Sequence, residues 1–209
     1  MGTNAAVYLA NYFLFTYELA FLEKLIREDD LPTLQDFMHT GRYLDDIIVA
    51  HNPSFEAYKD TLYPQDMLQL NLEQSGLDVH FLDVRIYKPR HSRRHYSTSI
   101  YDKRTDEKLR HLPHTKYPHI MSFIPNRFKY NVILSQAWRF ARRCQSISSF
   151  IYNTACLLRD LRLKGYILSH LIRLFKSVVQ RQPFMRKGLS TKTLVSRVQR
   201  RYKQLLLCR

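Results

Sequence analysis

The sequence has only three cysteines, and they are widely spaced. Cys144, Cys156 and Cys208 are an odd number in a chain of 209 residues, so they exclude a framework of paired disulfides and favour a reducing, intracellular compartment. No pair of cysteines has the spacing of a zinc finger, although histidines cluster within residues 91–95 and 111–119. We interpret these histidines as solvated loop residues; metal binding by them is the alternative.

Long apolar runs are also scarce. The most apolar stretch, residues 5–22, is interrupted by an asparagine, a threonine and a glutamate, and it lacks the basic leader of a signal peptide. We therefore expect no signal peptide, no membrane span and no membrane partner. The stretch is predicted to form a buried amphipathic helix that runs to about Arg27, with Asn4 as its cap.

Acidic side chains are rare in the second part of the chain. Residues 86–209 carry 28 basic and 4 acidic side chains, a net charge of +24, whereas residues 1–85 carry 5 basic and 14 acidic ones, a net charge of −9. A segment this basic indicates a polyanionic partner, and nucleic acid is favoured over an anionic membrane. The loop from Lys88 to Arg94 is the candidate boundary, which divides the chain into residues 1–90 and 91–209.

The first part is predicted to be mixed α/β. Residues 39–44 and 47–51 flank an acidic pair and predict a hairpin, because Ile47, Ile48 and Val49 favour a strand. A short helix is expected after Ser54, with Phe55, Tyr58 and Leu62 on one face. An antiparallel sheet backed by two helices is the simplest assembly. Its further strand candidates are residues 68–72, 82–86 and 96–101.

The second part, from about Asn131, is predicted to be an all-α bundle. One helix is capped by Ser146 or Ser148 and ends at Gly165, and a second spans residues 167–179. A last helix begins near Ser190 and is amphipathic. Its outward-facing basic residues are Arg197, Arg200, Arg201 and Lys203, a run of the kind that is often only solvated.

The sharpest chemical signal is the run Tyr43-Leu44-Asp45-Asp46 at the tip of the predicted hairpin. Two adjacent carboxylates repel each other unless a cation lies beside them. Mg²⁺ takes hard oxygen ligands, and phosphoryl transfer between nucleotides uses two such ions. The alternative is an ordinary solvated turn, where aspartate is common.

This run matches the Tyr-x-Asp-Asp hairpin in the palm of reverse transcriptases. Further blocks, in the same order, resemble those of eukaryotic retroelement enzymes of the Penelope-like and related groups. The resemblance covers about residues 1–180 and implies an α+β fold, with a palm-type antiparallel sheet and two helices followed by a helical, thumb-like bundle. These blocks are residues 1–14, 81–84, 99–106, 135–144 and 164–166.

The resemblance implies an RNA-directed DNA polymerase, a nucleotidyltransferase with Asp45 and Asp46 as its catalytic Mg²⁺ ligands. In this family a third metal-binding aspartate and the fingers lie upstream of the first helix, where this chain begins. The resemblance therefore implies that the isolated chain is inactive and that its protein partner is either an upstream polymerase half or a ribonucleoprotein. Lys59 is the nearest candidate for the family's proton donor. Contacts to an RNA template or RNA–DNA duplex are expected from Tyr43, Lys103, Arg104, Arg139, Arg142 and Arg143.

A second hypothesis is a non-catalytic RNA-binding or ribonucleoprotein subunit that has kept the fold of a reverse transcriptase and lost the reaction. The excess of basic residues favours it, and a nuclear location suits this charge better than an organellar one. For Arg139, Arg142 and Arg143 a solvated helix face is the alternative. Trp138 and Phe140 are expected in the core, because aromatic residues at helical spacing are usually buried.

Overall fold

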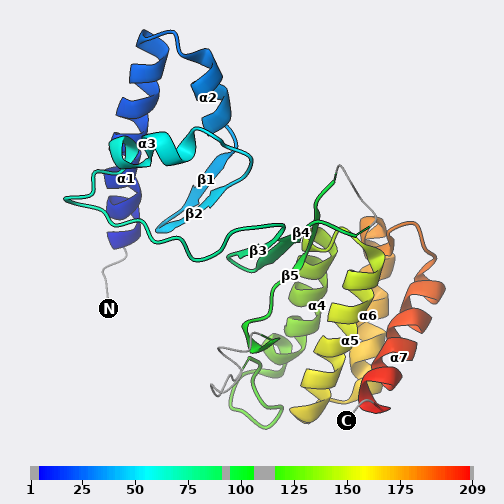
Figure 1. Ribbon diagram of the computed structural model, residues 1–209. Coiled ribbons are helices and arrows are strands. Elements are labelled where there is room, and N and C mark those ends of the chain that lie inside the picture. Colours follow the sequence, from blue (N-terminus) through cyan, green and yellow to red (C-terminus); the bar gives the residue numbers. More distant parts are fainter. Residues whose placement is uncertain (1–4, 91–94, 106–115, 208–209) are drawn as a thin grey trace. The chain divides into compact units, whose positions relative to one another are not determined.

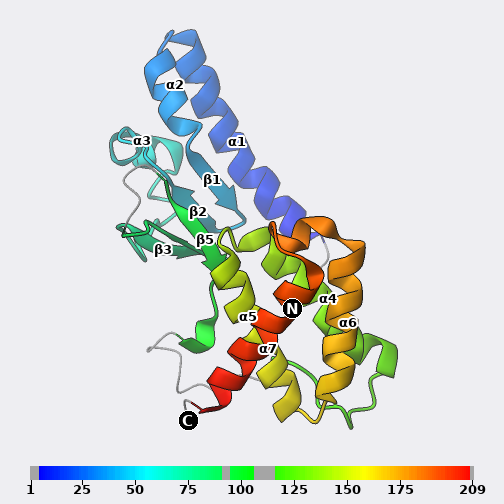
Figure 2. The same ribbon diagram turned by 90° about the vertical axis from the view of Figure 1, so that its right-hand side faces the viewer.

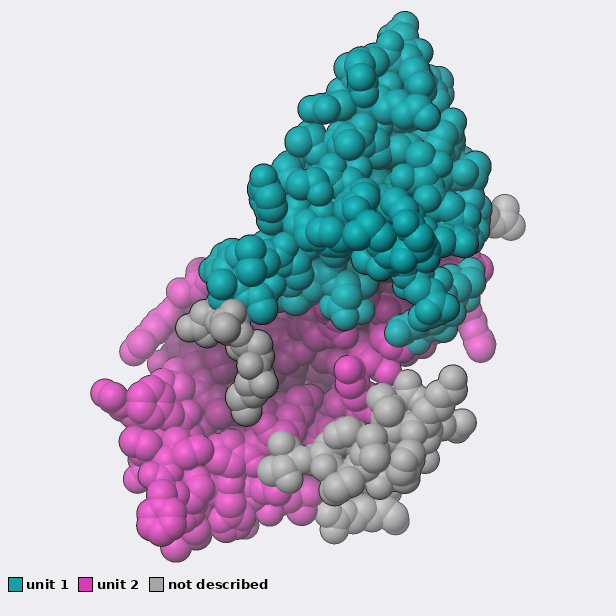
Figure 3. Space-filling view, turned by 90° about the vertical axis from the view of Figure 1, so that its left-hand side faces the viewer, with its two compact units in different colours: residues 1–75 teal, residues 76–209 magenta. Residues whose placement is uncertain are grey.

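The computed structural model describes residues 5–90, 95–105 and 116–207 (Figure 1). The described residues form seven α-helices and two small antiparallel sheets, so the expected α+β class is confirmed. The chain divides into two compact units, Met1–Ser75 (unit 1) and Gly76–Arg209 (unit 2), which Figure 3 colours separately.

Unit 1 begins with the expected helix, which ends at Arg27; its proposed cap, Asn4, lies outside the described residues. A second helix was not expected. It begins after Asp30, whose carboxylate accepts a hydrogen bond from the backbone N–H of Thr33, and Pro32 occupies its first turn. The elements of unit 1 are α1 (Ala6–Arg27), α2 (Leu31–Phe37), β1 (Thr40–Tyr43), β2 (Asp46–Val49) and α3 (Phe55–Leu62).

The expected hairpin and short helix of unit 1 are confirmed. Strands β1 and β2 pair antiparallel, with Tyr43 opposite Asp46, so only two residues form the turn. Helix α3 faces the core of the unit, against which its Phe55 and Tyr58 pack, while Leu62 is fully part of it. The buried residues of this core are Phe21, Leu25, Phe37, Leu62 and Tyr63.

The prediction that α1 is buried along its length was wrong. Only Phe21 and Leu25 are buried, whereas Tyr8, Leu9 and Tyr12 are 77%, 66% and 69% exposed. The core of unit 1 contacts the C-terminal half of α1, and the described part of the unit offers no cover for its first turns. None of the described helices is long and apolar enough to span a membrane.

Unit 2 contains a three-stranded sheet and a bundle of four helices. The helices predicted to begin near Ser146 and Ser190 and to span 167–179 are all present, while the first helix begins at Asn126, earlier than expected. The strands are β3 (Asp78–Phe81), β4 (Val84–Tyr87) and β5 (Ser97–Ile100). The helices are η1 (Lys103–Thr105), α4 (Asn126–Arg143), α5 (Ile147–Leu163), α6 (Leu168–Arg181), η2 (Pro183–Arg186) and α7 (Thr191–Leu207).

The prediction of a single sheet was also wrong. Strands β3, β4 and β5 pair in that order in unit 2, separate from the β1–β2 hairpin. Residues 68–72 form no strand: Leu68 packs on the core of unit 1, but Leu70 and Leu72 are exposed. Their alternation with polar residues therefore does not mark a half-buried face. Strands β4 and β5, which lie on either side of the expected boundary at residue 90, pair with each other within unit 2.

The core of unit 2 lies between its helices. Helix α7 packs along α5 (Figure 2). Its Leu194 and Val198 are buried in the same core as Phe150 and Leu158 of α5. The basic residues on the opposite side of α7 are exposed, as the pattern predicted. The amphipathic pattern of this helix thus separates a packed apolar stripe from a basic one.

Candidate nucleic-acid interface

The tip of the β1–β2 hairpin presents Tyr43, Asp45 and Asp46 to solvent. Leu44, the first turn residue, has a φ of +56°, and Leu82 has the same φ at the same position of the β3–β4 turn. A positive φ at this position alone is typical of a type II′ hairpin turn, where glycine is usual. A leucine in the left-handed region costs about 1–2 kcal/mol, so both turns need support from their surroundings.

The support at the first hairpin comes from Arg42 on β1. Its Nη1 donates hydrogen bonds to the carbonyl oxygen of Leu44, at 3.0 Å, and to Oδ1 of Asn11, at 2.9 Å. Its Nε and Nη2 bind the two carboxylate oxygens of Glu18, at 2.5 and 3.0 Å, and the hydroxyl of Tyr63 donates to the same carboxylate at 2.6 Å. Helix α1 therefore holds the backbone of the turn through one guanidinium.

Burial alone would raise the pKa of the Glu18 carboxyl, but the hydrogen bonds from Arg42 and Tyr63 and the charge of Arg42 lower it below its ordinary value. Burial and the neighbouring Glu18 carboxylate raise the pKa of Tyr63, so its hydroxyl stays protonated as a donor. This cluster was not predicted from the sequence. Its signal was a glutamate inside the most apolar stretch of the chain, where an unpaired charge is costly.

Asp45 and Asp46 are the two carboxylates expected to bind Mg²⁺, and both lie at the exposed tip. The described residues contain no group of three or more histidine, cysteine, aspartate or glutamate side chains that could hold a metal ion. Two carboxylates on one hairpin fit part of a Mg²⁺ ligand set but do not make the two-metal site of nucleotidyl transfer. Lys59 pairs with Glu56 at 2.6 Å on the exposed surface of α3.

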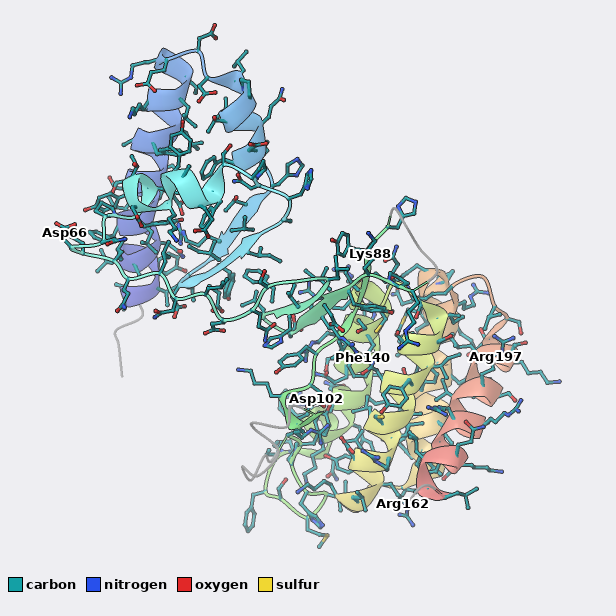
Figure 4. The ribbon with its side chains drawn as sticks, in the orientation of Figure 1. Asp66, Lys88, Asp102, Phe140, Arg162 and Arg197 are labelled. Carbon is teal, nitrogen blue, oxygen red and sulfur yellow. The ribbon has the colours of Figure 1, made fainter. Side chains whose placement is uncertain are left out.

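Three of the expected nucleic-acid contacts lie on α4, and they differ in their interactions with neighbouring side chains. Arg139 is half-buried, and its Nε binds Oδ2 of Asp83 at 2.6 Å. Arg142 and Arg143 are exposed at the end of the helix, and the guanidinium of Arg142 lies 4.5 Å from the centre of the Trp138 ring. The same helix turns Phe140 into the core, as expected (Figure 4).

Two further expected nucleic-acid contacts, Lys103 and Arg104, lie on η1. Lys103 is exposed, but Arg104 is half-buried: its Nη2 is 2.7 Å from a carboxylate oxygen of Asp102 and of Asp160. Lys116 also binds Asp102, at 2.9 Å. Burial raises the pKa of Asp102, yet these two cations lower it far more, to well below its usual range. Arg104 is therefore already paired with two carboxylates, those of Asp102 and Asp160.

The four acidic residues that the structure describes in unit 2 are all neutralised in this way. Each pairs with an arginine: Asp78 with Arg85, Asp83 with Arg139, Asp102 and Asp160 with Arg104. Unit 2 has 29 basic and six acidic residues in its sequence. Most of the lysines and arginines that the structure describes in unit 2 have no acidic partner, and they create a positive potential over the unit.

A groove of about 990 Å³ opens on unit 2 between strands β4 and β5 and helices α5 and α7. Three tyrosines and six arginines line it, together with small polar side chains. Their positions on α5 and α7 follow helical spacing, so each helix turns one face to the groove. These residues include Arg85, Tyr87, Tyr101, Asp102, Arg104, Tyr152, Cys156, Arg159, Arg197, Arg200, Arg201 and Gln204.

The groove is lined in part by basic residues of the last helix that were not expected to bind a ligand. Arg197, Arg200 and Arg201 were interpreted as part of a solvated run, yet they share the groove with Tyr152 and Arg159 of α5. The available signal was the helical spacing of polar and aromatic residues on α5 and of arginines on α7. The sequence does not show that α7 packs along α5, and this packing brings the two sets of residues together.

No protein-family model matches the chain, and no curated protein and no solved structure matches it either.

Proposed function

We propose that the chain is a nucleic-acid-binding protein derived from a reverse transcriptase, in which unit 2 binds the phosphate backbone. The observation that carries the binding proposal is the charge pairing of unit 2. Arginines neutralise all four described acidic residues, and most of the described basic side chains have no acidic partner. Surplus lysine and arginine side chains bind nucleic acid by displacing the cations condensed on its phosphates.

Within unit 2, Lys103, Arg142 and Arg143 are the most direct candidates for phosphate contacts among the residues expected from the sequence. All three are exposed, and none has a carboxylate within ion-pair distance among the described residues. Arg142 also lies against Trp138, so the aromatic ring limits the positions of its guanidinium. Phosphate contacts of this kind position a protein on nucleic acid without selecting a sequence.

The test is binding of the whole chain to an RNA–DNA duplex at several salt concentrations. The logarithm of the association constant should fall linearly with the logarithm of the salt concentration. The double variant Arg142→Gln/Arg143→Gln should bind more weakly and show a shallower salt dependence. The variant Lys176→Gln/Arg181→Gln, on the exposed side of α6, removes the same charge as a control. An affinity that does not change with salt would refute the proposal.

The proposed descent from a reverse transcriptase is supported by the Tyr-Leu-Asp-Asp run at the exposed tip of a two-residue hairpin. Asp45 and Asp46 are its candidate Mg²⁺ ligands, and Mg²⁺ would supply the charge neutralisation for nucleotidyl transfer in the complete parent enzyme. Because two carboxylates do not complete such a site, we expect no DNA synthesis by this chain alone. A non-catalytic ribonucleoprotein subunit has the same binding surface and is the alternative to an enzyme fragment.

Primer extension on an RNA template with Mg²⁺ tests whether the chain itself has polymerase activity. Extension by the wild-type chain that Asp45→Asn abolishes would establish an active polymerase and exclude the non-catalytic alternative. Extension that survives this substitution would come from a contaminant. The expected result is no extension, while Asp45→Asn binds the duplex as well as the wild type or slightly better, since it removes a negative charge.

A further inference from the structure

We propose that the groove between β4, β5, α5 and α7 binds a short single-stranded segment of nucleic acid, with its phosphates on the arginines of α7 and its bases on the tyrosines. This inference rests on the proposed nucleic-acid binding of unit 2 and assigns one part of that unit to one form of the ligand. All of the residues that line the groove belong to unit 2 and are described by the structure.

The cations of the groove are available to a ligand. Arg197 and Arg200 have no ion pair or hydrogen bond with the described residues, and both are exposed on α7, where Figure 4 labels Arg197. Arg201, one turn beyond Arg197, is also exposed and hydrogen-bonds only the side chain of Gln204, at 3.1 Å. These arginines lie at helical spacing on one face, so they can follow successive phosphates.

The acidic residues at the groove do not oppose a phosphate. Asp102 lines it, but its carboxylate is bound by Arg104 and Lys116. The neighbouring Asp160 does not line the groove, and it is bound by Arg104 and Arg159. Asp160 is only 10% exposed. Both carboxylates are therefore paired, while Arg197 and Arg200 on α7 have no acidic partner among the described residues.

The aromatic residues offer surfaces for bases. Tyr152 of α5 is 43% exposed, and the guanidinium of Arg201 lies 5.3 Å from the centre of its ring. Arg85 lies at the same distance from the ring of Tyr87 on β4. A base stacked on such a ring gains about 1–3 kcal/mol irrespective of its identity, and an adjacent arginine adds a cation–π contact.

The combination of arginines and tyrosine rings in the groove favours a single strand over a duplex. In a double helix the base faces are stacked inside, so a duplex presents phosphates to a groove but no base face to Tyr152 or Tyr87. The ring of Tyr101 is already stacked on His80. The volume, about 990 Å³, lies at the upper end of the range of about 300–1,000 Å³ for small-ligand pockets, which admits a few nucleotides but not a helix. A single strand uses both the arginines and the rings.

The test compares a fluorescent single-stranded RNA of twelve uridines with an RNA–DNA duplex, each titrated with the whole chain. The variant Tyr152→Leu keeps the charge of the groove and removes one ring. It should weaken single-strand binding roughly tenfold and leave duplex binding unchanged. The variant Arg197→Gln/Arg200→Gln should reduce the slope of log affinity against log salt by about 1.4 for the single strand. Lys176→Gln/Arg181→Gln on α6 is the charge-matched control.

Cys156 provides a readout that needs no substitution. It lines the groove and is partly exposed, whereas Cys144 is fully buried in the core. Labelling with a small maleimide, followed by peptide mass spectrometry, should modify Cys156 in the folded chain and leave Cys144 unmodified. Single-stranded RNA should protect Cys156, and the duplex at equal saturation should not.

The outcomes separate this inference from the proposed function. If neither nucleic acid binds at low salt, both fail. If the duplex binds with the expected salt dependence but Tyr152→Leu does not discriminate single strand from duplex, or Cys156 is labelled equally with and without RNA, the groove assignment fails and the proposed function stands. If uridine monophosphate competes as effectively as the RNA, the groove is a mononucleotide pocket and the assignment also fails.

Discussion

Arg42 and Glu18 form a two-point ion pair that joins strand β1 to helix α1, with Nε and Nη2 of the guanidinium 2.5 and 3.0 Å from the two carboxylate oxygens. The side chains are only 13% and 23% exposed. The same guanidinium donates to the carbonyl oxygen of Leu44, the strained residue of the turn. The position of the Asp45-Asp46 tip therefore depends on Glu18, which lies 24 residues before Arg42 in the chain.

Loss of either charge should loosen this hairpin. Arg42→Met leaves the Glu18 carboxylate largely buried with only the hydroxyl of Tyr63 as a donor, and hydrogen bonds to charged groups contribute about 1.5–3 kcal/mol. We expect a loss of about 2 kcal/mol in the local free energy of unfolding. Hydrogen exchange of the β1–β2 amides, followed by mass spectrometry, should then speed up by more than tenfold.

The control for this prediction is Lys24→Gln, which breaks the pair of Lys24 with Glu28 on the same helix. That pair is 3.9 Å long with both side chains at least half exposed, so its loss should change stability by less than about 0.5 kcal/mol. Equal exchange rates in Arg42→Met and Lys24→Gln would mean that the ion pair does not hold the hairpin.

The same cluster makes the stability of unit 1 depend on pH. The hydrogen bonds from Arg42 and Tyr63 hold the pKa of folded Glu18 below its ordinary value of 4.5, against the effect of burial. A lowered folded-state pKa contributes stability that is complete above the unfolded-state pKa and is lost as the pH falls through it towards the folded-state value. The hairpin amides should therefore lose protection as the pH falls from about 5 to 3, after correction for intrinsic exchange. Glu18→Gln should start less protected and lose less over this range.

The regular elements could be predicted from the sequence because their signals are local. Ser146 caps α5 through a hydrogen bond from the backbone N–H of Ser149, and Ile47 and Ile48 favour a strand wherever they are placed. The exposure of Tyr8 and Leu9 could not be predicted, because the sequence of an apolar helix face does not indicate whether another segment covers it. The separation of the two sheets depends on long-range pairing, which alternation alone does not encode.

The candidate site was predictable to a smaller extent. Asp45 and Asp46 lie at a hairpin tip as expected because a two-residue turn is a local feature. Charge counts predicted a basic unit but not which cations are available: Arg104 is bound by two carboxylates, whereas Arg197 is free of them. Ion pairs between Arg104 and Asp160 join residues 56 apart in sequence, and no spacing rule connects them.

Gly165 should not tolerate a side chain. It follows α5 with a φ of +86°, and the N–H groups of Gly165 and Tyr166 donate to the carbonyls of Arg162 and Leu161, which closes the helix in a Schellman motif. A Cβ atom here would lie 2.7 Å from Cγ2 of Ile120. Gly165→Ala should cost about 2 kcal/mol or more, from left-handed strain and this clash. Urea unfolding monitored by the fluorescence of Trp138, the single tryptophan, measures it.

The matched control is Gly188→Ala. Gly188 also has a positive φ, +82°, but a Cβ atom there meets nothing within 4 Å. It should therefore show the strain of the left-handed backbone without the clash, about 1 kcal/mol. If Gly165→Ala is no more destabilising than Gly188→Ala, the contact with Ile120 adjusts at no cost and backbone strain alone explains the glycine.

Asp83→Asn should strengthen nucleic-acid binding by releasing Arg139. In the folded chain Arg139 is held by Asp83 at 2.6 Å, on the same helix as the exposed Arg142 and Arg143. Asparagine fits the turn after β3 and removes the charge that competes with phosphate for this guanidinium. The slope of log affinity for an RNA–DNA duplex against log salt should become steeper by about 0.9, the contribution of one additional phosphate contact.

The change of net charge alone has to be separated from the release of the arginine. Asp66→Asn removes the same charge from an exposed position of unit 1 and releases no arginine, because the structure records no ion pair for Asp66 (Figure 4). It should raise affinity slightly at low salt and leave the slope unchanged, since no phosphate contact is added. If Asp83→Asn and Asp66→Asn give the same slope, Arg139 makes no phosphate contact, and its pairing with Asp83 serves only to join the β3–β4 turn to α4.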